Sequence, residues 1–215
     1  MTGLTIEAVL TGTARPLRGE EMSAIVKAPR LGAVVVKPLG LDGDEQADTV
    51  HHGGVDMAVH HYPRDHYAWW AERMPDQALL GAAGAFGENI STTGLDENTA
   101  CIGDRYRLGT ALVEISQGRK PCWKPAHRLG RPALVAEIVK TGRSGWYYRV
   151  IEPGVVAVGD ALTLERRPHP EWTVARVFGL IVGGAGKSDP VSLKALSGLK
   201  LLSAEWRERA RMMSA

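Results

Sequence analysis

Short apolar runs alternate with glycine-containing turns along most of the chain, up to about residue 165. Runs of this kind, bounded by turn residues, are typical of the strands of a sandwich or a barrel. Gly109-Thr110 has the length of a two-residue hairpin turn, and it joins two such runs. The predicted strands are Ile6–Thr11, Ala24–Lys27, Gly32–Lys37, Ala58–His61, Arg105–Leu108, Ala111–Ser116, Tyr147–Ile151 and Ala161–Glu165.

Two segments inside this region have helical spacing instead. Pro63 suits a first helical turn, and Tyr67, Trp70 and Met74 follow it at helical intervals. An aromatic stripe of this kind indicates core packing, because aromatic side chains dominate buried area. A second helix is predicted over Pro132–Lys140.

The pattern becomes helical throughout after Pro168. Residues 171–182 read as an amphipathic helix, Asp189-Pro190 is a cap and first-turn pair, and Ser203 precedes a last helix with Trp206. Arginines and prolines around residues 166–170 mark a linker. We therefore predict an α+β protein: a mainly β domain with inserted helices over residues 1–166, and a small three-helix domain over residues 167–215.

Composition and net charge limit the classes of function that the chain can have. The chain has 215 residues and a net charge of +2, which is too mild to indicate nucleic-acid binding. Two cysteines do not make a disulfide framework, and they favour a metal-binding or catalytic role in a reducing compartment. The first residues lack a signal-peptide pattern, and no long uninterrupted apolar stretch occurs. We expect a cytoplasmic protein without a membrane or nucleic-acid partner.

The two cysteines differ in their surroundings. Cys122 lies among Arg119, Lys120 and Lys124, and neighbouring cations favour the thiolate that binds metals or attacks electrophiles. A buried structural cysteine is the other interpretation, and the segment alone leaves both open. Cys101 has no cation within three residues and fits the structural interpretation better.

Four of the seven histidines lie between Gly40 and Pro63. Glycine and histidine together suggest backbone N–H groups and imidazoles directed at an anionic or metal-bound ligand. If residues 58–61 form a strand, His60 and His61 point to opposite faces and cannot bind one ion together. The four are His51, His52, His60 and His61.

Three other motif interpretations fail on spacing. The run GLIVGGAGKS at 179–188 has Ile181 where a P-loop needs its first glycine. The acidic run from Asp42 has Gly53 where a calcium loop needs its bidentate glutamate. A zinc hydrolase is disfavoured, because neither a His-Glu-x-x-His nor a Cys-x-x-Cys spacing occurs.

The remaining motifs are, in order along the chain, GDEQAD, HHGGVD, HYPRDHY, FGENIS, SQGRKPCWK and TGRSGWYYRV. Together they resemble the YiiM-like branch of the MOSC-domain family, named after the C-terminal domain of molybdenum-cofactor sulfurase. The resemblance runs from about Ser23 to Val158, with a family-like helical tail beyond. Gly118 departs from the usual proline, which is expected to loosen the loop, and Met57 replaces a common basic residue, which is expected to remove a phosphate contact.

The resemblance implies a β-barrel-like fold that holds a molybdenum–molybdopterin cofactor, with Cys122 as the metal ligand and as a catalytic residue. It implies reduction of N-hydroxylated compounds, such as hydroxylaminopurines and amidoxime-like molecules, to amines. His52 or His61, with His60 as a third candidate, would donate protons. The residues expected to bind the cofactor are His51, His52, Gly53, Gly54, Asn89, Arg119, Lys124 and Arg143.

The same resemblance implies a separate electron donor, a flavoprotein or an iron–sulfur protein, because no GxGxxG fingerprint follows a predicted strand. A function of another class stays open. Cys122 could carry sulfur as a persulfide, or the protein could bind the cofactor for delivery without reducing a substrate. A thiolate of low pKa suits both functions, so the sequence does not separate them.

Overall fold

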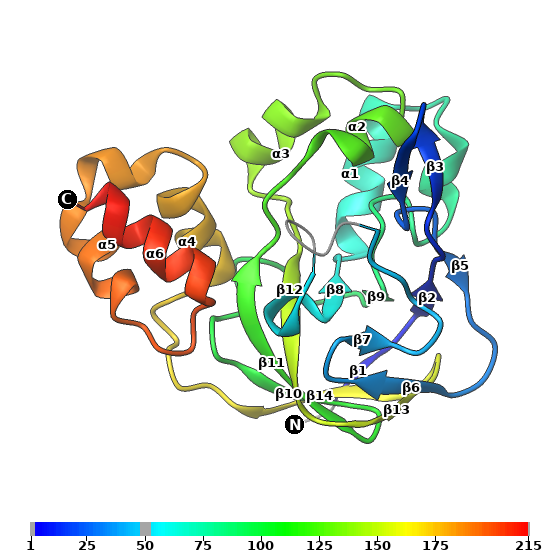
Figure 1. Cartoon of the computed structure of the whole chain (residues 1–215), viewed down its shortest axis with the longest axis horizontal. Coiled ribbons are helices and arrows are strands. Elements are labelled where there is room, and N and C mark those ends of the chain that lie inside the picture. The colour runs from blue at the N-terminus through cyan, green and yellow to red at the C-terminus, as the bar shows by residue number, and fades with distance from the viewer. Residues whose placement is uncertain (1–2, 48–52, 215) are drawn as a thin grey trace.

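The computed structural model describes residues 3–47 and 53–214. A curled sheet of nine strands forms its centre (Figure 1). The pairs are antiparallel except for one parallel contact, in which His61 lies beside Ile90. In order across the sheet, the strands are β1 (Leu4–Thr5), β14 (Ala161–Arg166), β10 (Arg105–Leu108), β11 (Ala111–Gly118), β12 (Trp146–Glu152), β8 (Val59–His61), β9 (Ile90–Ser91), β2 (Ala8–Thr11) and β5 (Ala28–Pro29).

Two smaller sheets complete the β structure. One contains β13 (Gly154–Val156), β6 (Val34–Lys37) and β7 (Gly40–Leu41), in that order. The other is the hairpin of β3 (Arg15–Arg18) and β4 (Glu21–Ser23). The mixed α+β fold predicted from the sequence is confirmed.

The hairpin of β10 and β11 forms as the sequence predicts. Leu108 pairs with Ala111 around the turn, and Gly109 has a φ of 58°, in the left-handed region that glycine tolerates. Strand β11 continues to Gly118, two residues beyond the predicted end, and all of its residues are buried. The hairpin therefore delivers the segment that contains Cys122 from a central strand of the sheet.

The six α-helices fall into two groups, and Figure 1 shows the first three at one end of the sheet and the last three beside it. Tyr67 and Trp70 are buried, which confirms the core role of the aromatic stripe. Asp189 and Ser203 cap their helices as predicted. The helices are α1 (Asp65–Arg73), α2 (Trp123–Arg128), α3 (Leu134–Thr141), α4 (Val174–Ile181), α5 (Pro190–Ser197) and α6 (Ala204–Met213), with 3-10 turns η1 (Val55–Met57), η2 (Ala78–Gly81) and η3 (Ala185–Ser188).

The predicted strand over Ala24–Lys27 is wrong. These residues connect β4 to β5 without joining either pairing. The Ile25 amide donates to the Ser23 hydroxyl at 3.2 Å, and the Lys27 amide donates to the Ile25 carbonyl at 3.1 Å. Local turns therefore use the backbone groups that a strand would give to its neighbour.

The C-terminal helices pack against the sheet through the end of β11, and one hydrophobic cluster contains residues of both. Arg167, just after β14, donates to the fully buried carboxylate of Asp104 at 2.7 Å. The division into domains at residues 166 and 167 stays a prediction. Of the helices in the described part of the chain, none has the length and hydrophobicity that a membrane span requires.

Candidate functional site

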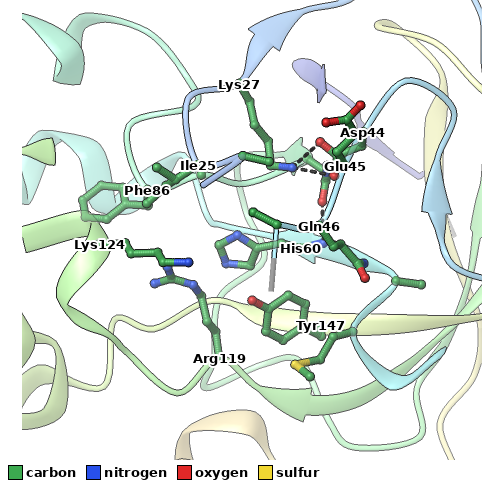
Figure 2. Close-up of a pocket in the computed structure, with 16 residues that line it drawn as sticks. Ile25, Lys27, Asp44, Glu45, Gln46, His60, Phe86, Arg119, Lys124 and Tyr147 are labelled. Atoms are coloured by element: carbon green, nitrogen blue, oxygen red, sulfur yellow. Dashed lines mark hydrogen bonds and ion pairs between the residues drawn. The ribbon is translucent and has the colours of Figure 1, made fainter. Parts of the chain in front are cut away.

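A cavity of about 100 Å³ lies where α2, the end of β11, β8 and the turn before β9 meet (Figure 2). Its polar lining is rich in cations, which come from two separate segments: Lys27 from one, and Arg119 and Lys124 from the other. Flat rings line it as well, those of His60, Phe86 and Tyr147. The cavity thus offers positive charge together with ring faces.

Arg119 follows β11 directly and is 6 % exposed. Its backbone amide donates to the Gly145 carbonyl at 3.0 Å, which ties it to the residue before β12. Its Nη1 is buried and has no hydrogen-bond partner among the residues that the structure describes. A buried donor without an acceptor is costly, so this guanidinium is arranged for an acceptor from a ligand.

His60 lies on β8 and is 4 % exposed. Its Nε2 is also buried without a partner within residues 3–47 and 53–214. Burial lowers the pKa of His60 well below its usual range, and the positive charge of Arg119 lowers it further. His60 is therefore a neutral imidazole at physiological pH, with its ring centroid 5.1 Å from that of Tyr147.

Lys27 and Asp44 form a buried ion pair at the opposite end of the cavity, and both side chains are 7 % exposed. Lys27 Nζ donates to both carboxylate oxygens of Asp44, and Figure 2 marks these contacts with dashed lines. Burial lowers the pKa of Lys27, and Asp44 opposes this effect. Asp44 and Glu45 set two carboxylates against the three cations of the lining, which keeps an excess of positive charge.

Asn89 connects the two ends of the cavity. Its Nδ2 donates to Asp44 Oδ2 at 2.8 Å and to the Leu10 carbonyl at 3.1 Å. Its Oδ1 accepts from the His60 amide at 3.0 Å. Since these bonds occupy the amide at both ends, Asn89 orients Asp44 and β8.

Cys122 lies beside this cavity. It precedes α2 with an extended backbone and is half-buried. Burial raises the pKa of Tyr147, the charge of Arg119 lowers it, and Cys122 raises it. Both Arg119 and Cys122 therefore lie within electrostatic range of the Tyr147 phenol, which lines the cavity.

Residues 48–163 match the model of the MOSC domain. The chain belongs to the MOSC-domain family. It is similar to the protein YiiM of Escherichia coli, with 43% identity over 159 residues, which are 74% of this chain and 71% of that protein. A protein named reductase from Gibberella moniliformis is 41% identical over 166 residues, which cover 77% of this chain and 29% of that protein.

Solved structures agree with this assignment over the whole chain. The crystal structure of YiiM from Geobacillus stearothermophilus aligns with a TM-score of 0.82 at 32% identity, and it covers 99% of this chain and 100% of that one. The three C-terminal helices lie beyond the residues that match the MOSC domain.

The lining residues fit the molybdenum cofactor with which MOSC domains are associated. A phosphate-bearing pterin needs cations and polar groups free to hydrogen bond, and Arg119, Lys124 and His60 Nε2 provide them. The Cys122 thiol is a soft donor for a polarisable metal. In the described part of the chain, no group of three or more His, Cys, Asp or Glu is arranged to hold a metal ion.

Asn89, Arg119 and Lys124 are the residues predicted from the sequence that line the cavity of this MOSC domain. Gly53 and Gly54 do not line it, and Gly54 is exposed with a φ of 90° at the start of η1. Two more of the predicted residues, His51 and His52, lie outside the described residues.

His61 faces away from the cavity, which confirms that His60 and His61 point to opposite faces of β8. Its Nδ1 is 3.1 Å from the Tyr148 hydroxyl, and its Nε2 is 3.1 Å from the Thr92 hydroxyl. Burial lowers the pKa of His61 to about 3. Because both ring nitrogens are hydrogen bonded in the core, the geometry favours His60 over His61 for contact with a ligand.

Arg143 also lies elsewhere. Its guanidinium lies 4.3 Å from the ring centroid of Trp69, and it lines a second cavity with His66 and Glu97. Cys101 is 2 % exposed, and burial raises its pKa, which confirms that it is a buried cysteine.

The sequence interpretation missed four lining residues that contribute charge or ring faces: Lys27, Asp44, Phe86 and Tyr147. Phe86 lies within the motif FGENIS. Asp44 and Tyr147 lie within motifs that carried the family resemblance, GDEQAD and TGRSGWYYRV, and those motifs are the signal that could have found them. Lys27 lies outside these motifs, in a segment wrongly predicted as a strand.

Proposed function

We propose that this protein is a molybdenum-cofactor-dependent reductase of N-hydroxylated compounds, with Cys122 as the protein ligand of the metal. The observation that carries the proposal is the pair of buried polar atoms without partners among the described residues, Arg119 Nη1 and His60 Nε2, in a cation-rich cavity beside a half-buried thiol. The name of the Gibberella moniliformis relative, reductase, supports the reaction class.

Each lining residue has a distinct part in this proposal. Arg119 and Lys124 bind the anionic part of the cofactor, because a guanidinium and an ammonium make charge-assisted hydrogen bonds to phosphate. Phe86 and Tyr147 present apolar ring faces to a flat heterocycle. When bound, the cofactor supplies the two-electron chemistry that cleaves the N–O bond.

The overall reaction converts R–NHOH, two electrons and two protons into R–NH₂ and water. His60 is neutral, so it orients a polar group by a hydrogen bond at Nε2 and holds no extra proton. Lys27 Nζ is the better proton source, because burial lowers its pKa and favours release of a proton. Asp44 limits this release by stabilising the charged ammonium.

The electrons come from a separate protein in this proposal, a flavoprotein or an iron–sulfur protein. The sequence lacks a GxGxxG fingerprint after a strand, so a bound nicotinamide or flavin of that type is not expected in this chain.

The test compares Cys122→Ser with the matched control Cys101→Ser and with the parent, each purified from a host that makes the molybdenum cofactor. A serine hydroxyl stays protonated and coordinates molybdenum weakly, so Cys122→Ser should lose reduction of a hydroxylaminopurine or an amidoxime with a chemical electron donor. Molybdenum and pterin content are measured in the same samples. Cys101→Ser should behave like the parent, because Cys101 is buried away from the cavity.

Full activity in Cys122→Ser would contradict the ligand assignment. A parent that holds molybdenum but reduces no N-hydroxylated compound would contradict the reductase proposal and favour a role in carrying sulfur or delivering the cofactor.

A further inference from the structure

The last residue of β11, Gly118, lies under side chains of the C-terminal helices. A Cβ atom on Gly118 would lie 3.1 Å from Cη2 of Trp206, and 3.5 Å from both Phe178 and Val174. Trp206 belongs to α6 and the other two to α4, and all three are at most 1 % exposed. Because glycine has no side chain, Trp206 can pack directly against the strand at Gly118. The sequence predicts that Gly118 loosens this loop, but packing against the helices holds the segment in place.

A hydrogen bond joins β11 and the C-terminal helices two residues before Gly118, at Ser116. The pairing of β11 with β12 is irregular between Ile115 and Gln117. At this irregularity, the Ser116 carbonyl accepts from the amide of Ser203 at 2.9 Å. Ser203 also caps α6 by accepting from the Trp206 amide at 3.3 Å. The start of α6 is thus fixed directly to the end of β11.

Arg119 is the next residue after Gly118 and lies on the other side of the chain. Successive residues of an extended segment point to opposite faces. Gly118 faces Trp206, and Arg119 accordingly lines the cavity. Any loosening at Gly118 therefore moves Arg119 as well. The backbone amide of Arg119 is hydrogen bonded to the Gly145 carbonyl on the side of β12.

We propose that Trp206 is a positioning residue for Arg119: the C-terminal helices clamp the end of β11 and thereby fix the buried guanidinium in the cavity. The helices lie outside the residues that match the MOSC domain, so the clamp adds a part to the site that the domain alone does not contain. The inference rests on the packing and does not depend on which ligand fills the cavity.

The test measures amide hydrogen exchange over residues 117–124 in the full-length protein. Trp206→Ala should speed exchange of the Arg119 amide by about tenfold or more, because removing the indole allows this segment to open locally. Amides of Val113 and Ile115, deeper in β11, should keep the protection of the parent. Trp206→Phe should restore most of the protection, since a second aromatic ring can cover Gly118.

Trp172→Ala is the matched control. Trp172 is also a buried tryptophan of the C-terminal segment, 8 % exposed, but Gly118 has other side chains as its nearest neighbours. This variant should be less stable overall, but its amide exchange should not increase selectively over residues 117–124. If Trp206→Ala does not fold, Gly118→Ala replaces it, because a Cβ there would lie 3.1 Å from Cη2 of Trp206 and disturb this contact while the indole stays in the core.

Equal exchange over 117–124 in Trp206→Ala and Trp172→Ala would overturn the proposal, as would unchanged exchange in Trp206→Ala. A second measurement is the molybdenum and pterin content after purification from a cofactor-producing host, which should fall several-fold in Trp206→Ala and stay at the parental level in Trp172→Ala. If the parent itself holds no molybdenum, the proposed function fails, whereas the exchange measurement still decides the role of Trp206.

Discussion

Replacing Arg119 with methionine tests whether the cavity is built for an anion. Arg119 Nη1 is buried without a partner among the described residues, so the protein without ligand bears the cost of that donor. Methionine fills a similar volume with a flexible apolar side chain. The variant should therefore be more stable than the parent when no cofactor is present, although it loses a residue of the site.

The magnitude follows from the cost of an unsatisfied buried donor, about 1–3 kcal/mol. In a chain of this size, each kcal/mol gained in the free energy of unfolding raises Tm by about 2–4 °C. Loss of a charge-assisted hydrogen bond worth roughly 1.5–3 kcal/mol should weaken retention of an anionic cofactor by about 10-fold to 150-fold. Stability and binding should thus change in opposite directions.

The assay is thermal unfolding of protein from a host that cannot make the molybdenum cofactor, together with metal and pterin analysis of protein from one that can. Arg149→Met is the control, because Arg149 is also largely buried but its charge is paired. Its guanidinium binds Asp56 at 2.8 Å and the buried Glu114 at 3.0 Å. This control should lose about 1–3 kcal/mol of stability.

If Arg119→Met were destabilised to the same extent as Arg149→Met, the reasoning would be refuted. The charge of Arg119 would then be satisfied in the protein without ligand, and the cavity would not be poised for an anion.

Two further predictions concern stability. Asp44→Asn leaves Lys27 buried without its carboxylate, so urea unfolding should show a loss of roughly 3–5 kcal/mol, and an unchanged midpoint would contradict the buried pair. The pH dependence follows from His61, whose pKa falls from an ordinary value of 6.5 to about 3, and from His60, whose pKa falls in the same direction. Since the unfolded chain binds these protons first, stability should drop as pH falls from 6.5 towards 3, by about 1.4 kcal/mol per pH unit from His61, and His60 should add to the loss in the same direction. Urea unfolding at pH 7 and pH 5 checks this, and equal stabilities would contradict it.

Local features of the fold could be predicted from the sequence, because their causes lie within a few residues. Gly109 permits the turn between β10 and β11, and Asp189 and Ser203 accept hydrogen bonds from amides three residues later. The exception is Ala24–Lys27, where apolar composition favoured a strand but local hydrogen bonds prevailed.

The sequence by itself also determined the chemistry of one segment, Arg119 to Lys124, because a thiol and its neighbouring cations are adjacent in the chain. Only the tertiary structure decided which other residues join them. The sheet order, with β8 between β12 and β9, brings Tyr147 beside His60. Lys27, before β5, and Asp44, after β7, come from distant segments and meet in a buried ion pair. The same order turns His61 into the core and puts Arg143 at another cavity. Such placement depends on long-range strand pairing and packing, which leave no signal in the spacing of neighbouring residues.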